Sequence, residues 1–288
     1  MLRIFHETTY RYARPVARSS HRLRLRPLVD AHQSLVDWKL DLSVGGERWE
    51  YEDVFGNHVT ALEVSAPFEE LVIRSSSLVR VHVAAPEPLR TAPGRDRLPL
   101  AWMPWQRQLM LPYLLPPELP ESELMALRDF ALGFVERNGS DLLATLQDMN
   151  ATLYRDFAYV PGITNAETTP FEVFVARQGV CQDFAHLLIC LARLLDVPAR
   201  YRVGYIHTGS DYENRLQSEA SHAWVEIYLP GAGWRGLDPT NGCLVGADHV
   251  RVACGRHFWD AAPTSGTIYG GGGETLSVDV RVERVTDV

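Results

Sequence analysis

The sequence predicts an α+β protein in which an antiparallel β domain is followed by a helix packed on a second antiparallel sheet. Short alternating apolar runs separated by turn residues fill residues 1–84, a pattern typical of an antiparallel sandwich or barrel. Apolar residues at helical spacing dominate 121–195, and alternation returns at 198–240. A chain of 288 residues with 46% hydrophobic content can bury two modest cores. We therefore expect two domains, residues 1–84 and 121–288.

Between them, residues 85–120 contain nine prolines, which is typical of a linker. The segment is nevertheless too apolar to lie free in water, since it includes Trp102 and Trp105. We expect it to run packed across both domains. Alternatively, its aromatic side chains form one wall of a substrate cleft.

Two helices are expected next. The first spans 121–137 and ends at Asn138-Gly139, and Ser140 is a candidate cap for a second helix. One face of that second helix is apolar, with Leu142, Leu146, Met149 and Leu153. Both helices should cover the second sheet.

A capping box begins the most informative stretch of the chain. Thr169-Pro170-Phe171-Glu172 combines a threonine cap, a proline at the first helical position and a glutamate three residues after the cap. The helix should end soon afterwards, because Gly179 can adopt the left-handed conformation that terminates helices.

A second helix should begin at about Cys181, because Phe184, Leu188, Leu191 and Leu195 fall on one stripe at helical spacing. Cys181 then occupies the helix N-terminus, where unpaired amides and the helix dipole favour a nucleophilic thiolate. The alternative is an inert cysteine buried in the core.

Two later strands carry candidate partners for this cysteine. Residues 221–227 alternate around His222, and residues 234–240 form the next strand with Asp238 near its end. A nucleophile at a helix N-terminus, with a base and an orienting acid on neighbouring strands, matches the logic of a Cys-His-Asp triad. Polar residues 207–219 predict a loop beside the site.

Other polar residues near these motifs are weaker candidates. His186 and Asp183 point away from Cys181 on a helix. Glu226 shares a strand face with His222 and is a rival orienting acid, although a rim charge is its simpler interpretation. A set of substrate-cleft candidates comprises Trp224, which is otherwise a core residue, together with Gln182 and Glu226. Metal binding is disfavoured, because helix geometry directs His186 away from the other donors.

Four blocks of sequence resemble one known family: GVCQDFAHL at 179–187, PARYRVGYI at 198–206, SHAWVEIYLPGAGW at 221–234 and GLDPTN at 236–241. They are similar, in the same order, to the bacterial transglutaminase-like cysteine proteins. The hairpin at 53–57 also resembles the N-terminal β domain that accompanies such cores. The resemblance implies a papain-like transglutaminase core over 121–288, with Cys181 as nucleophile, His222 as base and Asp238 as orienting acid. It implies no cofactor, and the calcium sites of animal transglutaminases have no matching loop here.

The expected chemistry is attack of the cysteine on an amide carbonyl, through a thioester. Hydrolysis, as by a peptidase or deamidase, is favoured, and protein-glutamine transamidation is the alternative. A non-catalytic protein-binding module is the rival from another class. The expected partner is a protein or peptide substrate, and the N-terminal β domain is a candidate site for a protein partner.

Charge and composition limit the other possibilities. A net charge of −8 argues against nucleic acid as a partner. The first residues lack the apolar stretch of a signal peptide, and no segment has the roughly 20 apolar residues that span a bilayer. The four cysteines show no metal-ligand spacing. These observations predict a cytoplasmic protein with no membrane association.

Overall fold

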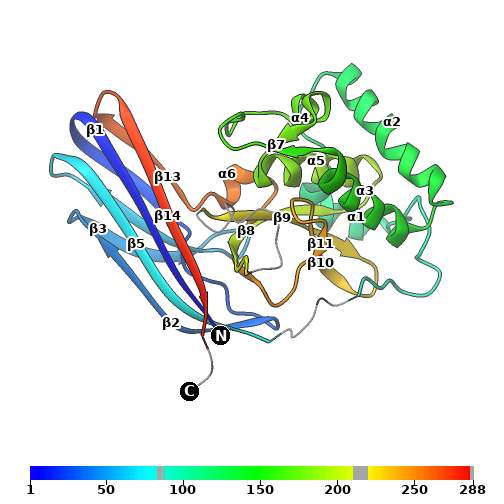
Figure 1. The fold of residues 1–288 in the computed structure, drawn as a ribbon, viewed down its shortest axis with the longest axis horizontal. Coiled ribbons are helices and arrows are strands. Elements are labelled where there is room, and N and C mark those ends of the chain that lie inside the picture. Colours follow the sequence, from blue (N-terminus) through cyan, green and yellow to red (C-terminus); the bar gives the residue numbers. More distant parts are fainter. Residues whose placement is uncertain (83–85, 87, 210–219, 286–288) are drawn as a thin grey trace.

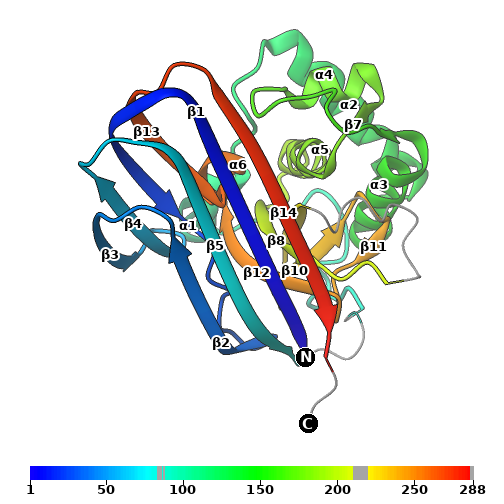
Figure 2. The same ribbon diagram turned by 60° about the vertical axis from the view of Figure 1, so that its left-hand side comes forward.

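The computed structural model describes residues 1–82, 86, 88–209 and 220–285. Two antiparallel sheets and a layer of helices make up the molecule. The second sheet lies between the N-terminal sheet and the helices (Figures 1 and 2). The predicted α+β class, with an antiparallel sheet first, is confirmed. Of the polar loop expected at 207–219, residues 210–219 lie outside the described part of the chain.

The N-terminal sheet is organised around its first strand, which is also its longest. Its strands are β1 (Leu2–Leu23), β2 (Gln33–Leu42), β3 (Glu47–Glu52), β4 (His58–Val64), β5 (Phe68–Val81), β13 (Thr264–Gly270) and β14 (Glu274–Arg284). The first half of β1 pairs with β5 and β14, and its second half pairs with β4 and β13. Because β1 is 22 residues long, each of its edges can hold two strands in succession.

The last two strands differ from our expectation. We expected residues 264–284 to belong with the domain at 121–288, yet β13 and β14 both pair with β1. Alternation of apolar residues predicts a strand but not the sheet that the strand joins. Here Val280 of β14 is buried with Leu2 and Ile4 of β1, which places the end of the chain in the N-terminal sheet.

The second sheet has the order β11-β10-β9-β8-β12. Its strands are β8 (Ala199–Ile206), β9 (His222–Leu229), β10 (Gly233–Asp238), β11 (Cys243–Leu244) and β12 (His249–Gly255). The helices after the linker are α2 (Glu121–Arg137), α3 (Leu142–Asp156), α4 (Pro170–Ala176), α5 (Cys181–Leu194) and α6 (Phe258–Ala261). Two short strands, β6 (Ala158–Tyr159) and β7 (Gln178–Gly179), pair in parallel. Ala223, Val225 and Ile227 of β9 face the buried side of α5 and form the main core with it.

Two local expectations for the helical layer need correction. Asp141, and not Ser140, caps α3, because the Asp141 carboxylate accepts a hydrogen bond from the N–H of Ala144 at 2.7 Å. The linker at 85–120 contains a helix, α1 (Pro104–Leu114). Trp102 packs against the main core, and its indole donates to the carbonyl of Asp196 at 2.9 Å.

Amide side chains of the N-terminal sheet and its loops hold β12 in place. Asn57 is fully buried; it donates to the carbonyl of Cys254 and accepts from the N–H of Cys254, both at 2.7 Å. Gln33 binds both backbone groups of Arg251 in the same way, at 2.8 Å. Each side-chain amide makes the pair of hydrogen bonds to the backbone of β12 that a neighbouring strand would make. The hairpin at 53–57 therefore fastens the N-terminal sheet to the second sheet.

None of the helices in the described ranges has the length and hydrophobicity needed to cross a bilayer.

Candidate active site

The segment before Cys181 folds as a pair of short elements that fix the start of α5. Thr169 and Glu172 form the predicted capping box: the Thr169 hydroxyl accepts from the N–H of Glu172 at 3.2 Å, and the Glu172 carboxylate accepts from the N–H of Thr169 at 2.7 Å. Helix α4 ends at Ala176, and Arg177, with φ of 54°, is the left-handed residue. The prediction that Gly179 ends this helix was wrong. The Arg177 guanidinium packs over three phenylalanine rings.

Gly179 is required for a different reason, namely the close approach of Asp183. A Cβ at Gly179 would lie 2.9 Å from the Asp183 side chain. That carboxylate accepts from the N–H of Val180 at 2.7 Å and from the hydroxyl of Thr164 at 2.6 Å. Burial raises the pKa of Asp183, partly offset by these two hydrogen bonds. Asp183 therefore caps the helix that begins at Cys181, and it makes no contact with His222 that would let it replace Asp238.

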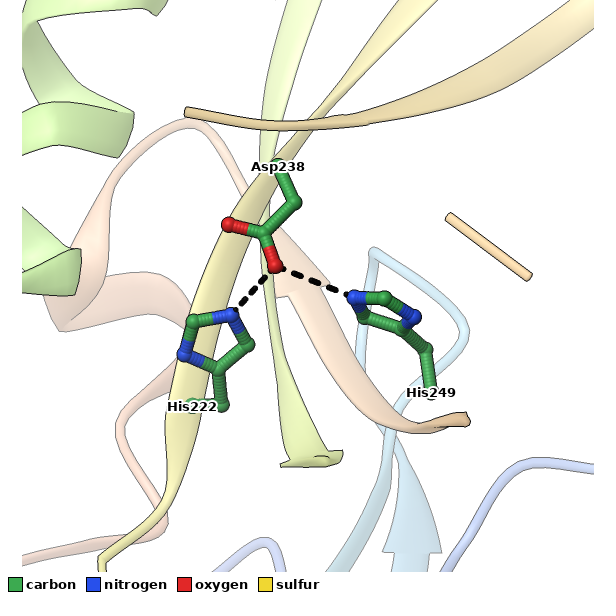
Figure 3. A group of neighbouring side chains, drawn as sticks. All are labelled: His222, Asp238 and His249. Atoms are coloured by element: carbon green, nitrogen blue, oxygen red, sulfur yellow. Dashed lines mark hydrogen bonds and ion pairs between the residues drawn. The ribbon is translucent and has the colours of Figure 1, made fainter. Parts of the chain in front are cut away.

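His222 and Asp238 meet as predicted. His222 is the first residue of β9 and Asp238 the last of β10, and both are fully buried. The imidazole Nε2 lies 2.7 Å from Oδ2 of Asp238 (Figure 3). The other ring nitrogen, Nδ1, is buried and has no hydrogen-bond partner among the described residues. It is the nitrogen left to interact with the sulfur of Cys181.

Asp238 accepts five hydrogen bonds from groups in the described part of the chain. Its Oδ1 accepts from the backbone N–H groups of Thr240 and Asn241 at 3.0 and 3.2 Å. Its Oδ2 accepts from His222 and from His249 Nε2, the latter at 3.1 Å (Figure 3). The Asn241 amide also donates to Oδ2, at 2.7 Å. The carboxylate is thus fixed in orientation and has a donor for each of its lone pairs.

His222 and Asp238 shift each other's pKa in the direction that favours the charged form of both. Burial alone would lower the pKa of His222, but the Asp238 carboxylate and the Cys181 sulfur raise it to about 10. Burial would raise the pKa of Asp238, whereas the charge and hydrogen bonds of His222 and His249 hold it well below the usual value. At neutral pH this environment favours an imidazolium paired with a carboxylate.

A cavity of about 250 Å³ lies beside Cys181. Its wall includes Tyr159, Tyr201, Phe258, Ser221 and the predicted cleft residue Gln182. None of the described residues that line it is an aspartate, glutamate, lysine or arginine. The aromatic residues of the linker are not among the residues that line it, contrary to the alternative considered from the sequence.

The two other predicted cleft residues, Trp224 and Glu226, are not among the residues that line this cavity. Trp224 is fully buried, with its ring centroid 5.9 Å from that of His222 and 5.3 Å from that of His249. Glu226 is 3% exposed, so it is not a rim charge. Its carboxylate pairs with Arg200 and Arg202, which lie on the neighbouring strand. Despite the cost of burial, Arg202 and then Arg200 lower the pKa of Glu226.

His186, treated from the sequence as structural, lies within the helical layer. Its Nε2 accepts a hydrogen bond from the N–H of Phe258 at 3.0 Å. Burial lowers the pKa of His186 to about 3, so the ring stays neutral. This contact fixes Phe258, one wall of the cavity, relative to α5.

His249 is the site residue that sequence reasoning missed. It begins β12, and only its position at the start of an alternating run marks it in the sequence. His222, Asp238 and His249 present three donor atoms within 4.8 Å of one another, a ligand set of the type that zinc accepts. The same atoms are joined by two hydrogen bonds, and these account for their proximity without an ion.

Comparison with known proteins identifies the family. Residues 2–80 match the bacterial transglutaminase-like N-terminal region, and residues 128–239 match the transglutaminase-like superfamily. An uncharacterized protein of Mycobacterium tuberculosis is 34% identical over 98% of this chain and 92% of its own length. The chain therefore belongs to the transglutaminase-like superfamily, in the group that carries the bacterial N-terminal region. Members of this superfamily are in general cysteine-dependent enzymes of acyl transfer.

Two further relatives are informative. A protein of Cytophaga hutchinsonii, whose crystal structure is described as that of a candidate cysteine protease, has a TM-score of 0.75 over 100% of this chain and 91% of its own. At 23% identity it shows that the fold is shared. A protein-glutamine gamma-glutamyltransferase of Pseudomonas aeruginosa is 34% identical over 103 residues, which are 34% of this chain and 15% of the relative.

Proposed function

We propose that this protein cleaves amide bonds through a Cys181-His222-Asp238 triad and a thioester intermediate, with water as the usual acceptor. The observation that carries the proposal is the buried 2.7 Å contact between His222 Nε2 and Asp238, next to the first residue of α5. Because Nε2 donates to the carboxylate, Nδ1 is the nitrogen that exchanges a proton with the thiol.

The reaction proceeds in two halves. His222 holds the proton of the nucleophile as an imidazolium, and the sulfur of Cys181 forms a bond to the carbonyl carbon of the substrate. As the carbon–nitrogen bond breaks, His222 gives its Nδ1 proton to the leaving amine. Water then gives a proton to His222 and attacks the thioester, and the carbon–sulfur bond breaks, which returns the sulfur to its place beside the imidazolium. Asp238 stays ionised throughout and holds the imidazole.

The start of α5 supplies the stabilisation of the oxyanion. The first four N–H groups of a helix have no acceptor within it, and the helix dipole adds positive potential there. The backbone N–H of Cys181 is therefore the proposed donor to the oxygen of the tetrahedral intermediate.

The substrate is a protein or peptide that presents an uncharged acyl group. The described part of the cavity wall is aromatic and apolar and has no acidic, lysine or arginine side chain, so it offers no partner to a charged group, which would have to lose its water. A glutamine carboxamide or a peptide bond meets this requirement. The N-terminal β domain is the proposed place for any protein partner, and the four free thiols fit the proposed cytoplasmic compartment.

Transamidation is the second candidate. It is favoured by the similarity over 103 residues to the Pseudomonas glutamyltransferase. Both reactions share the thioester and differ in the acceptor, so the partition between water and an amine separates them.

The test is to incubate the protein with benzyloxycarbonyl-Gln-Gly, and separately with denatured casein, with and without hydroxylamine. Mass spectrometry then counts glutamate, hydroxamate and cleaved peptides. Cys181→Ser should remove every product, and Cys190→Ser is the matched control because Cys190 is buried in the core. Hydroxamate in excess at millimolar hydroxylamine would favour transamidation. Products that persist in Cys181→Ser would refute the triad.

A further inference from the structure

We propose that His249 is a positioning residue that holds the Asp238 carboxylate toward His222, an inference that rests on the proposed function. Its imidazole reaches the same carboxylate oxygen as His222 does, from the opposite side (Figure 3). The triad then has a fourth member that touches neither the nucleophile nor the cavity beside it.

The tautomer of His249 follows from its two contacts. The N–H of Gly246 points to Nδ1 at 3.4 Å, so Nδ1 is the acceptor nitrogen. The hydrogen of a neutral ring therefore sits on Nε2, 3.1 Å from Oδ2 of Asp238. His249 is 3% exposed, which means that water does not compete for this bond. Its role is to donate one hydrogen bond in a fixed direction.

The protein holds His249 rigidly from three sides. His249 pairs with Ile206 in the sheet, and two residues along β12 Gln33 binds the backbone of Arg251. The Trp224 ring meets the His249 ring edge to face, and it also packs against His222. One buried indole thus supports both imidazoles. Gln33 of the N-terminal sheet thus helps to hold β12, and β12 carries the histidine that contacts Asp238.

The charged surroundings of His249 are asymmetric. On one side lie Asp238 and His222, and on the other a small cavity of about 50 Å³, whose wall includes His249 itself, Glu226, Arg251, Arg235 and His32. Without a donor at position 249, Oδ2 keeps its His222 and Asn241 donors but loses the one that holds it from the side opposite His222, so the carboxylate can turn away from His222. The pairing of His222 with Cys181 is then weakened.

The test compares His249→Gln, His249→Asn and His249→Leu with the wild-type chain. Glutamine places an N–H close to the position of Nε2, asparagine is too short to do so, and leucine has no donor. The rate at which iodoacetamide labels Cys181 is measured from pH 5 to 9, together with the urea midpoint. We expect His249→Leu and His249→Asn to label about fivefold more slowly at pH 6.5, with the acid limb moved to higher pH, and His249→Gln to stay near the wild-type profile.

A second readout does not depend on the nucleophile. The Nε2 proton of His222 should give a solvent-protected, downfield NMR resonance in the wild type and in His249→Gln, and this resonance should be lost in the asparagine and leucine variants. Retention of the resonance and of the profile in folded His249→Asn overturns the inference, as does equal loss in His249→Gln and His249→Asn. If His249→Leu does not fold, the other two decide. Failure of wild-type Cys181 to label faster than Cys190, with the resonance behaving as expected, refutes the proposed function alone.

Discussion

Replacing Asp238 with Asn removes the charge of the buried cluster while nearly preserving the shape of the side chain. Two backbone N–H groups donate to Oδ1, and three side-chain donors converge on Oδ2. An asparagine side chain has only one oxygen. If that oxygen accepts the two backbone hydrogen bonds, the NH2 group of the asparagine faces the three other donors. Removing one member of a buried ion pair costs roughly 3–5 kcal/mol. We expect the free energy of unfolding to fall by about that amount at pH 5.5.

The size of this loss should depend on pH. The pKa of Asp238 is depressed in the folded state from 3.8, so its contribution is present above that pH and is lost as the pH falls through the folded value. The pKa of His222 is raised from 6.5 to about 10, so its contribution is complete below pH 6.5 and is lost as the pH rises through 10. The difference between the two proteins is therefore largest between these limits, at about pH 4 to 6.5.

Urea denaturation followed by tryptophan fluorescence measures this difference, at pH 5.5 and again at pH 9.5. The expected result is a large destabilisation of Asp238→Asn at pH 5.5 that shrinks at pH 9.5. A loss below about 1 kcal/mol at pH 5.5, or a loss that grows with pH, would refute the charge assignment.

Three further substitutions test neighbouring parts of the structure. Glu226→Gln should destabilise the protein by roughly 3–5 kcal/mol, because the buried Arg202 and the partly buried Arg200 lose their carboxylate, yet leave iodoacetamide labelling of Cys181 unchanged; slower labelling would restore Glu226 as an orienting acid. Asn57→Ala should leave the N–H and C=O of Cys254 without partners, at about 1–3 kcal/mol each, and a thermal midpoint equal to the wild type would contradict this. Gly179→Ala should cost about 1–3 kcal/mol in urea denaturation, because the new Cβ approaches Asp183 to 2.9 Å; full stability would show that the capping carboxylate can move without cost.

Local signals in the sequence predicted the elements around Cys181 well. The capping box at Thr169 and the apolar stripe of α5 depend on residues within a few positions of one another, so short-range pattern rules apply. Arg177 shows the limit of such rules. It takes the left-handed conformation although Gly179 carried the stronger local signal, and its guanidinium packs over three phenylalanines that only the tertiary structure brings together.

The residues that sequence reasoning misplaced are those whose partners are distant in the chain. Strand β14 pairs with β1 at the other end of the chain, and alternation alone does not specify a partner strand. Trp224 and Glu226 share a face with His222, but that face of β9 is closed by other parts of the protein. His249 had no motif to mark it, because its role depends on the order of strands in the second sheet, where β8 separates β12 from β9 and β10.

The central claim, an activated nucleophile at Cys181, is tested most directly by iodoacetamide labelling of the native protein across pH, with the modified cysteine identified by mass spectrometry. Burial raises the pKa of Cys190 and of Cys243 to about 12, so neither should compete below pH 8. We predict selective labelling of Cys181 at pH 6 to 7 that is slowed strongly in His222→Ala. Labelling of Cys181 no faster than that of Cys190, or labelling unaffected by His222→Ala, would contradict the catalytic account and favour a protein-binding module.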